Sequence, residues 1–438
     1  TGANNTAVGR DALENNTTAN NNTALGYNAL IANTTGANNT AVGQGALLTN
    51  STGSNNVAVG DDALRLNTGS QNTAVGADCL DDNTANNNTG VGYRALYQNT
   101  TGTENTAVGD RALTTNTTAS ENTAVGHKAL EANTTGASNT AIGHQSMDTN
   151  TTGLQNTALG NVSLYANTTG SRNTALGRGA LQANTTANDN TAVGTYALYA
   201  NTTGTTNVGV GASALAANTT GSYNTAVGWK ALITSNSTYN TAVGYNAMNA
   251  NTTGFANCAV GPAALDGNTT GDRNTTIGYN AITNNTTGNN NTALGADTMV
   301  SNSTGHDNTA VGAWALNSNS TGSNNVGIGA SALEASTTAS GNTAVGWKSQ
   351  LRTTTGSGNI SVGQNTLQNI TTANYNTAIG NAVLYNSTTS YNTGVGYNVL
   401  YAQTTGSVNT AVGAEALDNC TTGSSNVAVG SEALDDCT

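Results

Sequence analysis

The chain is poor in the residues on which enzymes and ordinary globular cores depend. It has one proline, one phenylalanine and three histidines in 438 residues, and only 8% of its residues are charged. With so few titratable side chains, the usual acid–base constellations of active sites are scarcely available, so we expect neither enzymatic activity nor a cofactor. Low hydrophobicity favours disorder only when net charge is high, and −12 is small for this length.

Other absences exclude further classes of protein. Lysine and arginine number 11 against 23 acidic residues, which argues against nucleic-acid binding. No apolar run approaches the roughly 20 residues that a membrane span needs. A single proline argues against a collagen-like chain or a proline-rich linker.

What the sequence has instead is a repeat, T-A-V-G-x-x-A-L-x-x-N-T-T-G-x-x-N, whose positions are numbered from its first Thr. Its 26 copies account for all 438 residues; most have 17 residues, and four, beginning at Val57, Thr73, Thr225 and Thr377, have 16. Neither end resembles the capping repeats with which solenoids usually end. We therefore expect a single continuous repeat domain over residues 1–438 that belongs to a longer fibre or stacks end to end. A piece cut at repeat boundaries is the alternative.

The repeat predicts an all-β fold. Seventeen residues are too few for a helix-turn-helix repeat, which needs about 33, and Asn, Thr and Gly favour turns and strands over helices. One repeat per coil of a parallel β-solenoid, or β-roll, remains. We therefore predict 26 coils, with a first strand through Asn-Thr-Ala-Val-Gly and no helical domain.

The alternation within that strand places positions 1 and 3 on one face. Position 3 is always aliphatic, and position 1 is Thr or a small residue such as Val, so we interpret this face as inward. The small Ala at position 2 is then outward, under another layer. Position 8, usually Leu, is the second core site; in one copy it is Gln350, and we expect Leu351 to fill that slot. The first predicted core residues are Val8, Leu13, Leu25 and Leu30.

Two positions never change. Position 4 is Gly in all 26 copies, which indicates a corner with positive φ or close backbone approach; the first corner glycines are Gly9, Gly26, Gly43 and Gly60. The residue before each copy is always Asn, and stacked asparagines can form a hydrogen-bonded ladder along the coils. The first members of this predicted ladder are Asn5, Asn22, Asn39 and Asn56.

The run Asn-Asn-Thr-Ala-Val-Gly, with Asn4, Thr6, Ala7, Val8 and Gly9 in the first copy, resembles the N-S-V-A-I-G head repeat of trimeric autotransporter adhesins. The resemblance implies a left-handed parallel β-roll, inward Val side chains and a homotrimer. The second half of the repeat, A-L-x-x-N-T-T-G, departs from that pattern and is similar to repeats of bacteriophage tail fibres and other secreted microbial fibres. The expected partners are therefore other copies, as a homotrimer or an end-to-end filament.

The Asn-Thr-Thr segment is an N-glycosylation sequon, so the chain is a candidate glycoprotein. Coils about 4.8 Å apart leave little room for a glycan on each, and an Asn/Thr turn that stacks as a ladder is the alternative interpretation. Candidate acceptors include Asn16, Asn33, Asn99 and Asn116.

Two cysteines near the end, Cys420 and Cys437, both lie at position 11 of successive copies. Neighbouring coils would place their Cα atoms about 4.8 Å apart, within the disulfide range, so we predict a bridge. Cys79 and Cys258 occupy distant copies and are expected to be free thiols.

Aromatic residues recur after the corner glycine and after the Leu; they could stack on sugars or shield the corners by packing on one another. His127 and His144 share position 5 of adjacent copies, but a zinc site there would need two more ligands, and we predict no metal site.

These observations favour a structural fibre at a cell or virion surface, extracellular and without chemistry of its own. An adhesin whose stacked surface binds a glycan or a host receptor is the second hypothesis. The third is an ice-binding β-solenoid, although the Thr-Thr pair has the sequence of a turn and not that of a flat sheet face.

Overall fold

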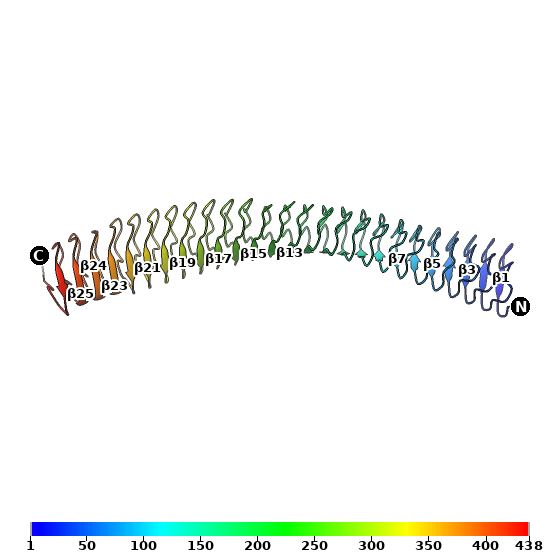
Figure 1. Ribbon diagram of the computed structural model, residues 1–438, viewed down its shortest axis with the longest axis horizontal. Helices are drawn as coiled ribbons and strands as arrows, with labels where there is room; N and C mark the ends of the chain where they lie inside the picture. Colours follow the sequence, from blue (N-terminus) through cyan, green and yellow to red (C-terminus); the bar gives the residue numbers. More distant parts are fainter. Residues whose placement is uncertain (1, 437–438) are drawn as a thin grey trace. The chain divides into compact units, whose positions relative to one another are not determined.

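A computed structural model of the chain describes residues 2–436. These residues contain strands and turns and no helix. They form two compact units, which divide between Ser222 and Tyr223, and each is described by itself. Figure 1 shows that the chain runs as successive coils, each of which contributes one short strand.

The first unit contains thirteen strands within its described residues. They are β1 (Thr6–Val8), β2 (Thr23–Leu25), β3 (Thr40–Val42), β4 (Val57–Val59), β5 (Thr73–Val75), β6 (Thr89–Val91), β7 (Thr106–Val108), β8 (Thr123–Val125), β9 (Thr140–Ile142), β10 (Thr157–Leu159), β11 (Thr174–Leu176), β12 (Thr191–Val193) and β13 (Val208–Val210).

The second unit also contains thirteen strands within the part that the structure describes. They are β14 (Thr225–Val227), β15 (Thr241–Val243), β16 (Cys258–Val260), β17 (Thr275–Ile277), β18 (Thr292–Leu294), β19 (Thr309–Val311), β20 (Val326–Ile328), β21 (Thr343–Val345), β22 (Ile360–Val362), β23 (Thr377–Asn381), β24 (Thr393–Tyr397), β25 (Thr410–Ala414) and β26 (Val427–Val429).

Within each unit, successive strands pair in parallel, with equivalent repeat positions opposite one another. In the first pair, Thr6 lies opposite Thr23 and Ala7 opposite Ala24. The ladder continues outside the strands, because the Leu13 N–H donates to the carbonyl of Ala29 at 3.0 Å. Hydrogen bonds between neighbouring coils therefore pair most of the backbone N–H and C=O groups. The predicted all-β parallel β-solenoid, with one repeat per coil, is confirmed.

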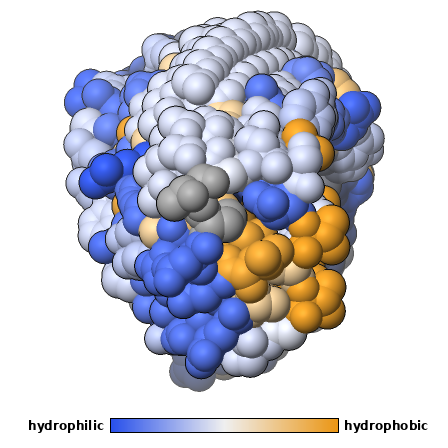
Figure 2. All heavy atoms as spheres, turned by 90° about the vertical axis from the view of Figure 1, so that its left-hand side faces the viewer, coloured by the Kyte–Doolittle hydropathy of each residue, from blue (hydrophilic) through white to orange (hydrophobic). Residues whose placement is uncertain are grey.

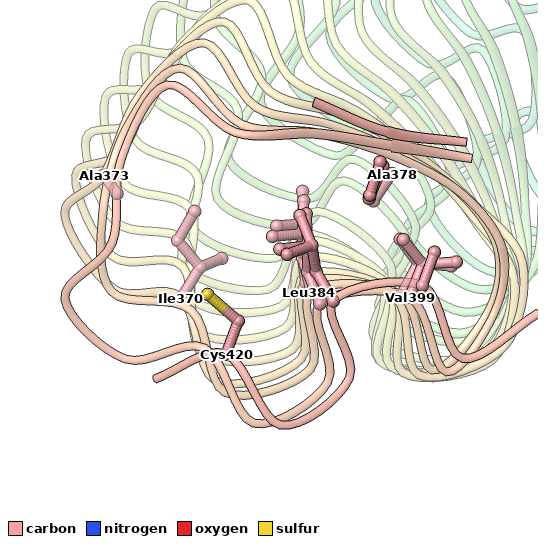
Figure 3. Packing of buried hydrophobic residues seen from close by; sticks show 13 residues of the cluster. Ile370, Ala373, Ala378, Leu384, Val399 and Cys420 are labelled. Carbon is pink, nitrogen blue, oxygen red and sulfur yellow. The ribbon is translucent and has the colours of Figure 1, made fainter. Parts of the chain in front are cut away.

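The prediction of which strand face is buried was wrong. Position 2 points inward: Ala24 is completely buried, whereas Val8 is 55% exposed and Leu25 is 47% exposed. The reason is the narrow interior, which Figure 3 shows in the second unit, where Ala378 faces Leu384 across the coil. Small side chains fit opposite the position-8 residue: most coils have Ala, and the largest is the buried Thr276.

The predicted position-8 core is confirmed for both residues named for it, since Leu13 and Leu30 are buried. Gln350 also occupies this site itself: it is completely buried, and its Nε2 donates to the carbonyl of Thr343 at 3.0 Å and to the Ser361 hydroxyl at 2.9 Å. Leu351 stays half-buried and does not take its place. A polar side chain is accepted here because the next coil supplies Ser361 where other coils have Ala.

The corner glycines combine positive φ with close backbone approach, as predicted. Gly26 has φ 141°, and a Cβ on it would lie 2.3 Å from the carbonyl oxygen of Gly43 in the next coil. Unexpectedly, non-glycine residues also adopt left-handed φ in each coil, among them Leu30 at φ 55° and Asn28 at φ 58°. Such a conformation costs a leucine roughly 1–2 kcal/mol, and the bonds to the neighbouring coils hold it in place.

Candidate functional site

The most extensive surface feature is the face that positions 1 and 3 of the strands present to solvent. We call it the outer strand face, formed in the first unit by β1–β13 and in the second by β14–β26. Its two columns contain Thr, Val, Ile and Cys at position 1 and only Val, Leu or Ile at position 3. Because side chains of a strand alternate between faces, the buried Ala at position 2 forces both columns outward.

Figure 2 shows hydrophobic side chains gathered on one side of the near end of the chain, beside hydrophilic ones. The strand at this end, β26, exposes Val427 and Val429 at positions 1 and 3. The aliphatic side chains of position 3 keep a substantial exposed fraction in both units. The face is therefore an apolar strip that carries a parallel column of threonine hydroxyls.

Aromatic side chains stack between adjacent coils along the two borders of this face. In β14 and β15, Tyr223 and Tyr239 precede the strands and stack with ring centroids 5.1 Å apart, while Trp229 and Tyr245 follow them and stack at 5.0 Å. The separation matches the spacing of neighbouring strands. For Trp229 and Tyr245, which follow the corner glycine, the prediction that aromatics pack on one another is confirmed; Tyr223 and Tyr239 stack at a position that the sequence analysis did not name.

Stacking determines what the aromatic rings can do. Each ring in a pair covers one face of its neighbour, and Lys230 lies over the Trp229 ring at 4.3 Å. Stacking therefore leaves at most one face of each ring free. Sugars stack on ring faces, so these pairs offer less to a glycan than isolated rings would, and their contribution is mainly to join coils.

The asparagines that precede the strands form the predicted ladder, but with a different bonding pattern. The Oδ1 of Asn22 accepts the backbone N–H of Asn39 at 2.9 Å, and its Nδ2 donates to the carbonyl of Gly36 at 2.9 Å. Asn5 and Asn39 serve their following coils in the same way, through Asn22 and Asn56. Each Asn side chain thus bonds to a backbone N–H and a backbone carbonyl that would otherwise have no hydrogen-bond partner at the corner.

Of the two interpretations of the Asn-Thr-Thr segments, the contacts of these asparagines support the stacked ladder and not the glycan acceptor. Asn33, Asn99 and Asn116 are completely buried, and the Nδ2 of Asn116 donates to Asn99 Oδ1 at 2.7 Å and to the Ala119 carbonyl at 2.9 Å. Asn16 is half-buried, and its Nδ2 donates to Ala19. The nitrogen that would carry the glycan lies inside the coil, so the alternative interpretation, a second asparagine ladder, is correct.

The cysteine predictions have different outcomes. Cys79 and Cys258 are free thiols, as expected, and burial raises the pKa of Cys79 to about 12. Cys420 is buried. Its predicted partner Cys437 lies outside the residues that the structure describes, so the bridge stays a prediction.

Charged side chains interact between coils at positions where the sequence analysis assigned no role. Arg65 and Asp81, at position 9 of adjacent coils, form a bidentate pair at 2.7 and 2.8 Å. Arg172 and Asp189 form another, which lowers the pKa of Asp189. Opposite charges 16 or 17 residues apart are the signal that could have revealed these pairs.

The carboxyl group of Asp148 has the opposite electrostatic environment. Its pKa is raised, first by burial and then by the negative charge of Glu131 at the same position of the preceding coil. Lys128 pairs with Glu131 at 3.0 Å and offsets part of this effect. The two carboxylates are the clearest electrostatic conflict in these two coils.

Residues 2–436 enclose no pocket and contain no group of three His, Cys, Asp or Glu side chains that could hold a metal ion. His127 and His144 stack on each other at 5.1 Å. In the same part of the chain, no helix has the length and apolar character that crossing a membrane requires. No known protein-family model and no curated protein sequence matches the chain.

Proposed function

We propose that the chain is a structural segment of an extracellular fibre at a cell or virion surface. The observation that carries the proposal is the coil-to-coil bonding at almost every part of the repeat: the strands, the position-8 turn and the two asparagine ladders. A repeat protein of this kind stores its stability in contacts between neighbours. Its length can be set by repeat number without a new core.

The same bonding suits a load-bearing element. A force along the stack of coils acts on many parallel hydrogen bonds at once, and the buried Asn side chains add bonds that water cannot easily replace. The resemblance of the strand motif to head repeats of surface adhesins supports the extracellular location.

Two measurements test the proposal. Oriented samples of the purified chain should diffract strongly at about 4.8 Å along the long axis of the particles. Antibodies against the chain should label intact cells or virions of the source without permeabilisation. Labelling that requires permeabilisation would contradict the extracellular role and leave the fold unaffected.

Ice binding is a second candidate, favoured by the threonine column of the outer strand face. The Thr-Thr pair that argued against it lies in a turn, whereas Thr40, Thr123 and Thr191 lie on the strands and point outward at position 1. Hydroxyl and methyl groups repeated at the coil spacing could order water. A purified chain that separates its freezing and melting points would support this candidate.

A further inference from the structure

The outer strand face lacks charged residues, although its exposure to solvent would allow them. In the 26 strands, neither position 1 nor position 3 carries a charged residue. Exposed positions two residues farther along the same coils do carry charge, as Asp61, Asp110 and Arg178 show. The solenoid surface therefore accepts charges beside this face and has none on it.

The strip is large enough to be an interface. A partly exposed aliphatic side chain retains roughly 25–50 Å² of apolar surface, so the thirteen coils of one unit offer on the order of 500 Å² from position 3 alone. The threonine methyl groups of position 1 add to this area. The total is comparable to the largest apolar patches of monomers, which are often functional, and approaches the roughly 800 Å² per partner of a standard protein interface.

The periodicity of the strip selects its partner. Its rows recur at the spacing of parallel strands, about 4.8 Å, so only a surface with the same spacing can fit every row. A second copy has that spacing and the same two columns. Two such faces can pack at about 10 Å, as stacked sheets do, with strands aligned.

We propose that the outer strand face of each unit packs against the same face of a second copy of this chain. The contact is isologous, so it pairs two chains and closes. It buries the Val, Leu and Ile side chains of position 3 that lie exposed in the single chain. The proposal does not depend on where the fibre is displayed, and it can fail while the proposed function stands.

The test compares charge on the face with the same charge beside it. The face variant carries L159K and V193K in the first unit and L294K and V362K in the second. The control variant carries N161K, T195K, A296K and Q364K, each on the same coil and two residues farther along at an exposed position. Both variants add four positive charges, and circular dichroism verifies that both are folded.

Sedimentation equilibrium of the full chain gives the outcome. We expect the wild type and the control variant at twice the chain mass of 43.6 kDa, and the face variant at the single-chain mass. A wild type that stays at the single-chain mass at its highest soluble concentration overturns the proposal, and thermal hysteresis of that single chain would assign the face to ice. A face variant that remains paired overturns it too, as does a mass of three chains, because an isologous face closes with two.

Discussion

At the scale of the residue, the side chains at position 7 of one coil and position 2 of the next share a small interior space, in which one methyl group matters. Most coils have Ala at position 2 and Ala at position 7. In two coils where position 7 is larger, at Cys79 and Val383, the next coil has Gly90 or Gly394 at position 2. A Cβ on Gly90 would lie 2.6 Å from Cys79 Sγ, and one on Gly394 would lie 2.5 Å from Val383 Cγ1. The volumes compensate because the interior is packed to solid density.

This compensation can be measured as a coupling. Gly90→Ala should destabilise the chain by about 1–3 kcal/mol through overpacking, and Cys79→Ala in the same chain should remove most of that loss by restoring the Ala–Ala pair of other coils. Chemical unfolding of the two single variants and the double variant gives the cycle. In the control, Gly209→Ala, the new Cβ would be 3.3 Å from Leu198 Cγ, so a smaller loss is expected. Additive effects of the two substitutions would contradict the packing account.

The second asparagine ladder makes a further prediction at the same scale. Asn116→Ala removes the donor to Asn99 Oδ1 and to the Ala119 carbonyl, and it leaves Asn133 Nδ2 without its 3.0 Å acceptor. Buried polar groups that lose their partners cost about 1–3 kcal/mol each, so we expect a loss of at least that size. Asn16→Ala, at a half-buried member of the same ladder, should cost less. Equal losses in thermal unfolding would show that burial does not set the cost.

At the scale of the element, a side chain on one coil is always beside its equivalent on the next. This juxtaposition turns a repeat position into a row, and like or opposite charges in a row interact directly. Position 9 provides examples of both, with Arg65 beside Asp81 and Glu131 beside Asp148. Sequence inspection finds such rows only when the repeat is written in register.

The contributions of Asp148 and Asp189 to folding stability should depend on pH with opposite signs. Burial raises the pKa of Asp148 above its usual value, so folding favours its protonated form, and stability falls as pH rises through the folded pKa. Asp148→Asn should therefore raise the unfolding midpoint at pH 7 relative to wild type and remove this loss. The measurement is the difference between the midpoints of variant and wild type from acid to neutral pH.

Asp189 is the matched comparison. Its folded pKa is lowered by Arg172, so the pair contributes stability above the unfolded pKa, which is lost as pH falls through the folded pKa. Asp189→Asn should lower the midpoint at neutral pH by a small amount, since both side chains are exposed. A shift of the same sign for both variants would contradict the electrostatic assignments.

At the scale of the whole molecule, each unit is a stack of coils that bond with their immediate neighbours, the arrangement from which nearest-neighbour stability arises. Deleting residues 106–122 removes one complete repeat and joins Asn105 to Thr123, which restores the Asn-Thr step found between most repeats. We expect this chain to fold with only a small drop in thermal midpoint. Deleting residues 106–114 removes about half a repeat and puts position 10 where position 1 belongs, so it should abolish the cooperative transition of the first unit. Equal tolerance of the two deletions would exclude register as the source of stability.

The sequence by itself determined the coil, the corner and the ladder. A 17-residue period rich in Asn, Thr and Gly admits little besides a solenoid, and an invariant Gly or Asn in every copy has the same neighbour above and below, so its backbone role follows from stacking. Only the tertiary structure decided which strand face is buried. Alternation shows that Ala lies opposite in direction to Thr and Val, but the interior width is set by the position-8 side chain across the coil, as with Ala378 and Leu384. That distance admits a methyl group, so Ala turns inward and the aliphatic column of position 3 is left facing outward.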